Sequence, residues 1–194
     1  MLNGGQVKGF QAYKDGTRLI GVAEIKLPTL KFMSEKIGGA DVLGEVELPL
    51  IGITESLECE VKFNSVISSL LSLVDVAGSL VEYRGSIATH DSATGAIAEK
   101  AVRIVTKSPP KEIDLGSLAT NKLMDSNCKL ELTYLKIEID GAAALEIDKF
   151  NAIFTILGKD LLVDYRDNLG LTAATPNSSS SDRATLGELL NFVA

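Results

Sequence analysis

The sequence predicts a mainly β, antiparallel protein with one packed α-helix. Between residues 129 and 164, apolar and polar residues alternate with the two-residue period of half-buried strands. The same alternation runs through residues 57–63, where the polar positions carry charged side chains. Residues 66–77 follow the helical period instead, so we expect strands to form most of the fold around a single helix.

Length and composition exclude several classes of protein. A chain of 194 residues fits one domain and can bury about 70% of its unfolded surface, so it needs no disulfide or metal to fold. The net charge of −7 argues against a nucleic-acid-binding surface, although acidity is also common in ordinary soluble proteins. No run approaches the roughly 20 apolar residues of a membrane span, and no signal peptide is visible. We therefore expect synthesis in the cytoplasm and no stable membrane association.

The first predicted element is a hairpin from Phe10 to Leu27. Its turn lies at residues 13–17, around the pair Asp15-Gly16. Pro28 ends the second strand, because proline has no N–H group to donate to a ladder.

Residues 29–56 are predicted to form a long assembly arm with a tip at 37–41. The alternation is interrupted by Pro49 and Gly52, and a compact domain seldom needs so long an irregular connection. A disordered surface loop is the alternative, but such a loop should not expose this many apolar side chains. The subunit-interface residues predicted on the arm are Lys36, Leu43, Val46, Leu48, Leu50 and Ile51.

The segment Leu57–Phe63 is the clearest predicted strand, with its charged side chains facing away from the apolar ones. Asn64 or Ser65 then offers an N-cap. A broad apolar stripe over residues 66–77 predicts the helix, and Gly78 is placed to end it. We expect this helix to pack on the strands.

Two further strands are predicted at residues 80–88 and 96–107. A polar turn at 89–95 joins them. Residues 111–118 are expected to link the second strand to the last hairpin, with residues 122–127 as a connector.

The last hairpin begins with two alternating runs whose phase changes between Tyr134 and Leu135. A β-bulge explains this change most simply, because it inserts one residue into a continuous strand. The pair Asp140-Gly141 follows directly and predicts a tight turn, since glycine adopts a positive φ without a Cβ clash.

The return strand, Leu145–Leu157, is apolar on both faces. Its second face carries Ile153 and Leu157 beside polar residues. A strand of this kind needs cover on both sides. We therefore expect the protein's own core on one side and another subunit on the other, with Ile153 and Leu157 as further interface residues.

The composition divides the chain into three parts. Residues 1–171 form the predicted β domain. Residues 172–184 are rich in serine and are predicted to be a flexible linker. Residues 185–194 are apolar again and are expected to form either a short docking helix or a frayed tail.

The sequence offers little for catalysis or metal binding. Cys59 and Cys128 lack metal-ligand spacing, and Cys59 is in phase with a buried face, so we expect two free thiols. The single histidine, His90, stands in a predicted polar turn beside Asp91 and Ser92, which does not hold a catalytic base in fixed geometry. No phosphate-binding loop or zinc-binding helix motif is present. The sequence therefore predicts no enzymatic activity, no cofactor and no metal site.

A family resemblance lies in the second half of the chain. The order Lys111-Glu112-Ile113-Asp114-x-Gly116, Ile139-Asp140-Gly141, then Glu146-Ile147-Asp148-x-x-Asn151-x-Ile153 resembles the major tail tube proteins of contractile phages. The ending Leu157-Gly158-Lys159-Asp160-x-Leu162, then Arg166-x-Asn168-Leu169-Gly170-Leu171, is similar to the end of that family. The order and spacing of these pieces, rather than any single one, carry the resemblance. The family includes the tubes of R-type contractile bacteriocins, and type VI secretion tubes share its fold.

The resemblance implies a β-barrel or sandwich protomer that forms hexameric rings, stacked into a hollow tube inside a sheath. The implied partners are further copies of the chain, the tail sheath protein, and the baseplate and tail terminator proteins. DNA would pass through the lumen without specific binding. The implied location is a virion tail or a released bacteriocin particle.

Two alternatives stay open at this point. One is a tube of a type VI-like secretion system that carries effectors. The other is a monomeric β-barrel module that binds a small ligand, with residues 29–56 as a lid. Size-exclusion chromatography separates the last from the others, because only tube proteins assemble into rings or filaments at high concentration.

Overall fold

The computed structural model describes residues 2–19, 21–39, 42–65, 68–75, 78–91 and 95–171. The chain divides into two units, Met1–Val163 and Asp164–Ala194. The sheets belong to the first unit, and helix α2 (Val163–Asn168) begins at the boundary. The predicted linker at 172–184 and the predicted apolar segment at 185–194 lie outside the described residues.

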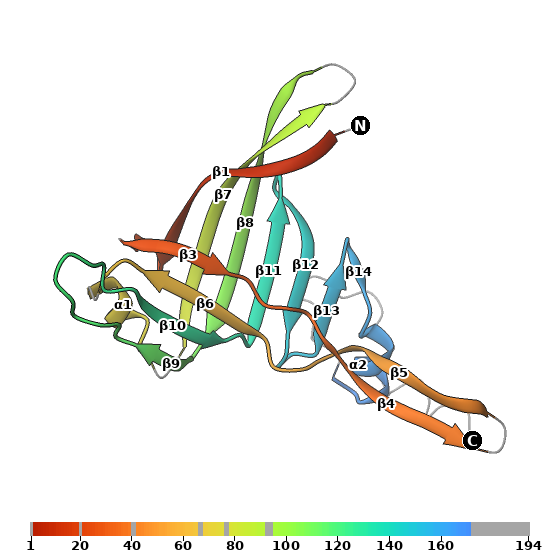
Figure 1. Ribbon diagram of the computed structural model, residues 1–194. Coiled ribbons are helices and arrows are strands. Elements are labelled where there is room, and N and C mark those ends of the chain that lie inside the picture. Colours follow the sequence, from red (N-terminus) through yellow and green to blue (C-terminus); the bar gives the residue numbers. More distant parts are fainter. Residues whose placement is uncertain are drawn as a thin grey trace, which may run out of the picture. The chain divides into compact units, whose positions relative to one another are not determined.

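An eight-stranded antiparallel sheet is the largest element, in the order β14-β13-β12-β11-β8-β7-β1-β2 (Figure 1). Its strands are β1 (Leu2–Lys14), β2 (Thr17–Arg18), β7 (Ser79–Asp91), β8 (Ile97–Ser108), β11 (Tyr134–Ile139), β12 (Ala142–Asp148), β13 (Ile153–Ile156) and β14 (Lys159–Asp160). The predicted strands at 80–88 and 96–107 are confirmed as β7, which is longer than expected, and β8, which is shifted by one residue.

A four-stranded sheet crosses one face of the large sheet, so that β3 and β6 pass over β7 and β8 (Figure 1). It comprises β3 (Val22–Lys26), β6 (Glu58–Phe63), β10 (Ser126–Glu131) and β9 (Pro110–Asp114), in the order β3-β6-β10-β9. The core lies between the two sheets and includes Cys59, Val61, Phe63, Val81, Tyr83, Leu130, Leu135, Ile147 and Phe154. The predicted mainly β fold is confirmed: twelve of the described strands form a sandwich-like pair of open sheets, and β4 and β5 form a separate two-stranded sheet.

The phase change at Tyr134-Leu135 marks a switch between sheets, and the predicted β-bulge is wrong. Strand β10 ends at Glu131 in the small sheet, and β11 begins at Tyr134 in the large one. Between them, the Leu132 N–H donates to the carbonyl of Leu57 (2.7 Å), and the Thr133 N–H donates to that of Lys107 (3.0 Å). A strand that moves to the facing layer must reverse its inward direction, which changes the phase of its buried positions.

The predicted return strand Leu145–Leu157 is two strands, β12 and β13, separated by a reversal at residues 149–152. The Asp148 carboxylate caps this reversal, accepting hydrogen bonds from the N–H groups of Phe150 and Asn151 (both 3.0 Å). Phe150 is 84% exposed, whereas Phe154 is fully buried. The prediction of one strand apolar on both faces is therefore wrong, because its positions belong to two strands and a turn.

Helix α1 (Ser68–Ser72) is shorter than the predicted helix over 66–77. Residues 66–67 and 76–77 lie outside the described residues. Leu70 and Leu73 are buried, but Leu71 and Val74 are about half exposed, at 54% and 47%. The apolar stripe was therefore wider than the face that the helix buries.

Three smaller predictions are corrected at strand ends. The turn at Asp15-Gly16 is present, but β2 has only two residues and β3 joins the other sheet, so Phe10–Leu27 is not one hairpin. The link expected at 111–118 contains strand β9. His90 lies on β7 opposite Ile97 rather than in a turn. Both cysteines are buried free thiols, as predicted.

Candidate assembly surfaces

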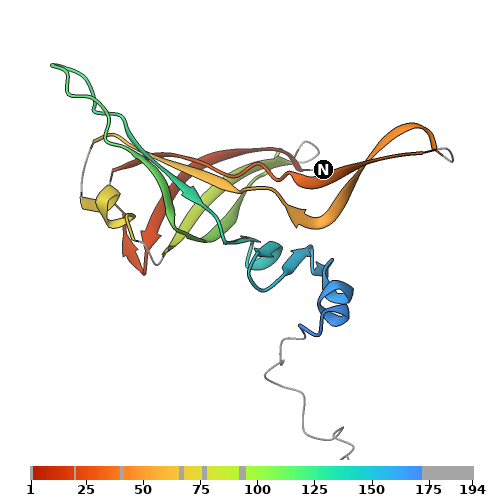
Figure 2. The same cartoon turned by 90° about the horizontal axis from the view of Figure 1, so that it is seen from below.

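The predicted arm is a β-hairpin that forms a sheet of its own. Strands β4 (Phe32–Gly39) and β5 (Val42–Thr54) pair antiparallel with each other, and among the described residues neither joins another sheet. Their ladder is irregular near both ends, with register shifts between Phe32 and Ser34 and between Ile37 and Gly39. Figures 1 and 2 show the hairpin projecting beyond the two stacked sheets.

The base of the hairpin is anchored at the β13–β14 end of the large sheet. The rings of Phe32 and Phe154 lie 5.7 Å apart at a tilt of 53°. Gly52 lies against Leu162: a Cβ at Gly52 would stand 2.6 Å from Cδ2 of that leucine, and its φ of +89° also favours glycine. Lys149 Nζ donates to the carbonyl of Glu55 (2.8 Å) just after the hairpin. The arm therefore leaves the sandwich from a packed base.

The arm exposes apolar side chains along its length. Seven large apolar side chains are between 37% and 66% exposed: Met33, Ile37, Val46, Leu48, Leu50, Ile51 and Ile53. Among the described residues, β4 and β5 pair only with each other, and these side chains stay exposed. Contiguous apolar surface of this kind marks an interaction site in soluble proteins.

The predicted interface residues fall at three places. Lys36, Val46, Leu48, Leu50 and Ile51 are exposed on the arm, and Leu43 lies on β5, with its side chain outside the described set. Lys36 Nζ lies 3.7 Å from the Glu45 carboxylate. Ile153 is half-buried on β13, whereas Leu157 is 81% exposed in the turn before β14. Met33, Ile37 and Ile53 are exposed on the arm as well, although the sequence analysis did not name them.

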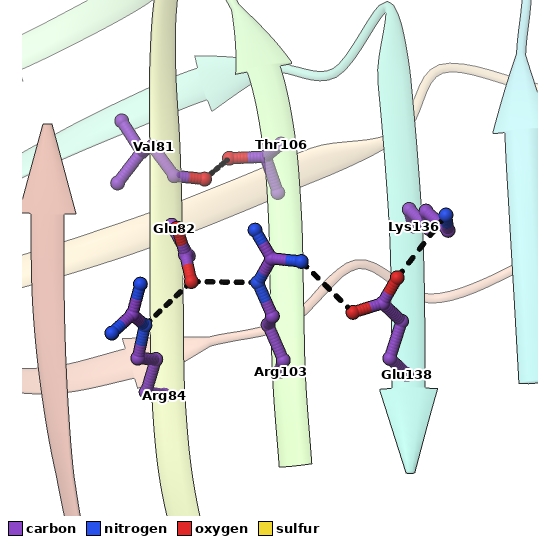
Figure 3. A network of polar contacts seen from close by, with 7 residues as sticks. All are labelled: Val81, Glu82, Arg84, Arg103, Thr106, Lys136 and Glu138. Atoms are coloured by element: carbon purple, nitrogen blue, oxygen red, sulfur yellow. Dashed lines mark hydrogen bonds and ion pairs between the residues drawn. The ribbon is translucent and has the colours of Figure 1, made fainter. Parts of the chain in front are cut away.

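The outer face of the large sheet carries a row of paired charges across β7, β8 and β11 (Figure 3). One carboxylate oxygen of Glu82 accepts hydrogen bonds from Arg84 Nε (2.5 Å) and Arg103 Nε (2.6 Å). Arg103 Nη1 also donates to Glu138 (3.0 Å), whose other oxygen lies 3.1 Å from Lys136 Nζ. The row links the three strands through side chains, in addition to the backbone pairing of β7 with β8 and of β8 with β11.

The pKa values follow from these contacts. Hydrogen bonds from Arg103 and then Arg84 lower the pKa of the Glu82 carboxyl to about 2. The bonds from Lys136 and Arg103 likewise lower the pKa of Glu138. Both carboxylates stay ionised at neutral pH and are matched by nearby cations, so the row has little net charge.

The described residues contain no group of three or more histidine, cysteine, aspartate or glutamate side chains placed to hold a metal ion. His90 is exposed on β7. Burial raises the pKa of the thiols of Cys59 and Cys128 to about 11 each, so neither is an activated nucleophile. Among the helices of the described part, none is long and apolar enough to cross a membrane.

Comparison with known proteins gives matches along most of the chain. The family model described as phage tail tube protein FII matches residues 5–170. The tail tube protein of Escherichia phage P2 is 29% identical over 171 residues, which cover 86% of this chain and 97% of that protein. The major tail tube protein of Serratia phage KSP20 is 28% identical over 156 residues, covering 80% and 89%.

Solved structures from an extracellular contractile injection system also match. The sheath/tube terminator, in the extended state, aligns with a TM-score of 0.47 and 8% identity, over 69% of this chain and 95% of the other. A chain of the sheath-tube complex, also in the extended state, aligns with a TM-score of 0.44 and 8% identity. The alignment covers 66% of this chain and 87% of the other. The match of the family model to residues 5–170 decides the assignment: the chain belongs to the phage tail tube protein FII family.

Proposed function

We propose that the chain is the repeating subunit of the inner tube of a contractile tail or a related injection machine. It matches nearly the full length of the P2 tail tube protein. The observation that carries the proposal is the β4–β5 arm, which exposes seven large apolar side chains and, in the described part of the chain, pairs with neither of the other sheets. The function is structural: the subunit polymerises as stacked hexameric rings that enclose a channel.

Unpaired strand edges support the same proposal. The large sheet ends at β14 and β2, and the small sheet ends at β3 and β9. Exposed edges are ready to pair with another chain, and closure of many sheets into one ring removes them. Ring closure by identical copies requires a head-to-tail interface, in which each copy presents two different complementary surfaces.

The remaining partners follow from this function. A tail sheath protein would surround the tube, and baseplate and tail terminator proteins would meet its two ends. The net charge of −7 disfavours retention of phosphate groups, so DNA could pass through the lumen without specific binding. The assembled protein would be found in a virion tail or in a released bacteriocin particle.

Electron microscopy of the purified protein tests the proposal. Negative staining should show hollow filaments or rings of uniform width at high protein concentration. Sedimentation velocity should show a matching loss of monomer as the concentration rises. A protein that stays monomeric at high concentration across a range of salt conditions would contradict the tube function and favour a small binding module.

A further inference from the structure

An apolar groove of about 310 Å³ lies in the sandwich, away from the arm. Its lining includes Val7 and Phe10 on β1, Ile25 on β3, Leu27 just after β3, Ile87 on β7 and Val102 on β8. These last two side chains are only partly buried, and Val7 is 65% exposed. The inner face of the large sheet is therefore left partly uncovered along this side of the sandwich.

In the described part of the chain, both strands beside the groove have a strand edge without a partner along most of their length. Strand β3 ends the small sheet. Strand β1 pairs with β7 on one side, and on the other β2 pairs only with Tyr13 and Lys14. From Leu2 to Gln11, that second side of β1 has no strand partner among the described residues. The groove thus offers an apolar floor between two strand edges that can accept further backbone hydrogen bonds.

The groove and the base of the arm involve different strands of the large sheet. The arm is anchored on Phe154 and Leu162, next to β13 and β14, whereas the groove opens beside β1. In the sheet order, β11 and β12 lie between the strands at the base of the arm and those that line the groove. One copy therefore presents two different apolar surfaces at separate places, which is the arrangement that a head-to-tail interface needs.

We infer that the groove between β1 and β3 receives the β4–β5 arm of a neighbouring copy of the chain. This inference rests on the proposed tube function and names the surface that the arm contacts. The arm strands have free edges that can pair with β1 or β3, and their exposed side chains can cover the groove floor. Seven half-exposed apolar side chains suit a surface of the order of ~800 Å² per partner, typical of a stable interface.

The charges at the groove agree with an apolar occupant. Its lining includes two residues with charged side chains, Glu24 and Arg84, and the Arg84 side chain belongs to the charged row on the outer face. Glu24 pairs with Lys62 (2.9 Å), and Arg84 with Glu82 (2.5 Å). Covering the groove therefore leaves neither charge without a partner, which avoids the largest cost of burying a charged group.

Cross-linking between two variants tests the inference. Protein with Leu48→Cys on the arm is mixed with protein carrying Val7→Cys in the groove, allowed to polymerise, and treated with a short bismaleimide. Both native cysteines are 0% exposed and should not react. The matched control replaces Val7→Cys by Leu118→Cys, a residue that is 88% exposed elsewhere on the chain. We expect dimers joined through positions 48 and 7, several-fold more abundant than dimers with the control.

The possible outcomes separate the two proposals. Filaments that form without the 48–7 dimer would overturn the groove assignment and leave the tube function standing. If the unmodified protein forms no filaments or rings, the tube function fails, and the groove inference falls with it. As a second measurement, Val7→Glu should reduce polymerisation at least tenfold with an unchanged circular dichroism spectrum, and Leu118→Glu should not. Normal polymerisation of Val7→Glu would also overturn the groove assignment.

Discussion

The sandwich and the arm share an alternating sequence pattern but differ in what covers them. In the sandwich, strands such as β6 have a facing layer, and Cys59, Val61 and Phe63 are at most 1% exposed. In the arm, the same kind of alternation leaves Leu48 and Ile51 49% and 66% exposed. An alternating pattern is therefore enough to predict a strand. Whether the apolar side chains of that strand are buried within one copy depends on a second layer that faces it. The sandwich supplies its own layer, and under the proposed tube function a neighbouring copy supplies the layer for the arm.

Removing the arm should have the largest effect on assembly and little effect on folding. In the variant, residues 36–47 are deleted and the gap is closed with a short Gly/Ser linker. We expect a native circular dichroism spectrum, because each doubling of loop length changes the closure free energy by only about 0.6 kcal/mol. We expect no filaments by sedimentation velocity, because Val46 and its neighbours no longer bury surface on another copy.

Leu118→Ala is the control for this deletion, since it removes an exposed apolar side chain outside the arm. An unfolded deletion variant would show that the arm belongs to the protomer's own core. A folded variant that still makes full-length filaments would show that the arm is dispensable. Either result would contradict the view that the sandwich is responsible for folding and the arm for assembly.

A matched pair of alanine substitutions compares the two regions by folding stability. Phe63→Ala should lower the free energy of unfolding by about 3–5 kcal/mol, because it leaves a cavity between the sheets. Ile51→Ala on the arm should change it by less than about 0.5 kcal/mol. Urea denaturation of the unassembled protein measures both values. Similar losses for the two variants would mean that the arm is packed as tightly as the core.

The charged row on the outer face should make an intermediate contribution to the free energy of unfolding. Glu82→Gln should lower the free energy of unfolding by about 1.5 kcal/mol, since it removes charge-assisted hydrogen bonds to two arginines. Glu99, which pairs with Lys8 at a more exposed position, provides the control, and Glu99→Gln should have a smaller effect.

The effect of Glu82 should depend on pH. Its pKa is lowered in the folded protein from 4.5 to about 2. Its stabilising contribution is therefore fully present above the unfolded pKa and is lost as the pH falls toward about 2. The difference between wild type and Glu82→Gln should shrink when urea denaturation is repeated at pH values between these limits. A difference that is constant with pH would mean that the ion pairs do not act through the ionised carboxylate.

The smallest expected effect concerns the thiols inside the sandwich. In protein purified without reductant, Ellman's reagent should detect almost no thiol in the native state and two after unfolding, because both cysteines are fully buried and unpaired. A thiol that reacts quickly in the native protein would show that the sandwich opens near Cys59 or Cys128. Detection of fewer than two thiols after unfolding would indicate that the cysteines had been oxidised.

The sequence predicted best where a strand keeps one role along its whole length. Leu57–Phe63 has one buried and one charged face, and the structure confirms both. Asp140-Gly141 was correctly assigned as a turn, with both residues at positive φ. Such local rules are visible in the residues themselves, since they depend on side-chain periodicity and on backbone sterics.

The errors arose where tertiary structure redirects a local pattern. The change of phase at Leu135 is compatible with a bulge or with a move to the facing sheet, and only the position of the second layer decides between them. Asp148 reads as an ordinary polar strand residue until it is seen to cap the following reversal. The pairing of Glu82 with Arg103 depends on the register of β7 and β8, which the sequence did not reveal.

The contact between Gly52 and Leu162 has a mechanical consequence for a filament built from this chain. The arm is fixed at its packed base, so the position of its tip depends on the angle at which it leaves that base. A methyl group at Gly52 would push against the leucine side chain and tilt the arm. A small rotation at the base produces a larger displacement at the tip of the arm, and this displacement would repeat at every subunit. One glycine can therefore influence how successive subunits are rotated along the filament.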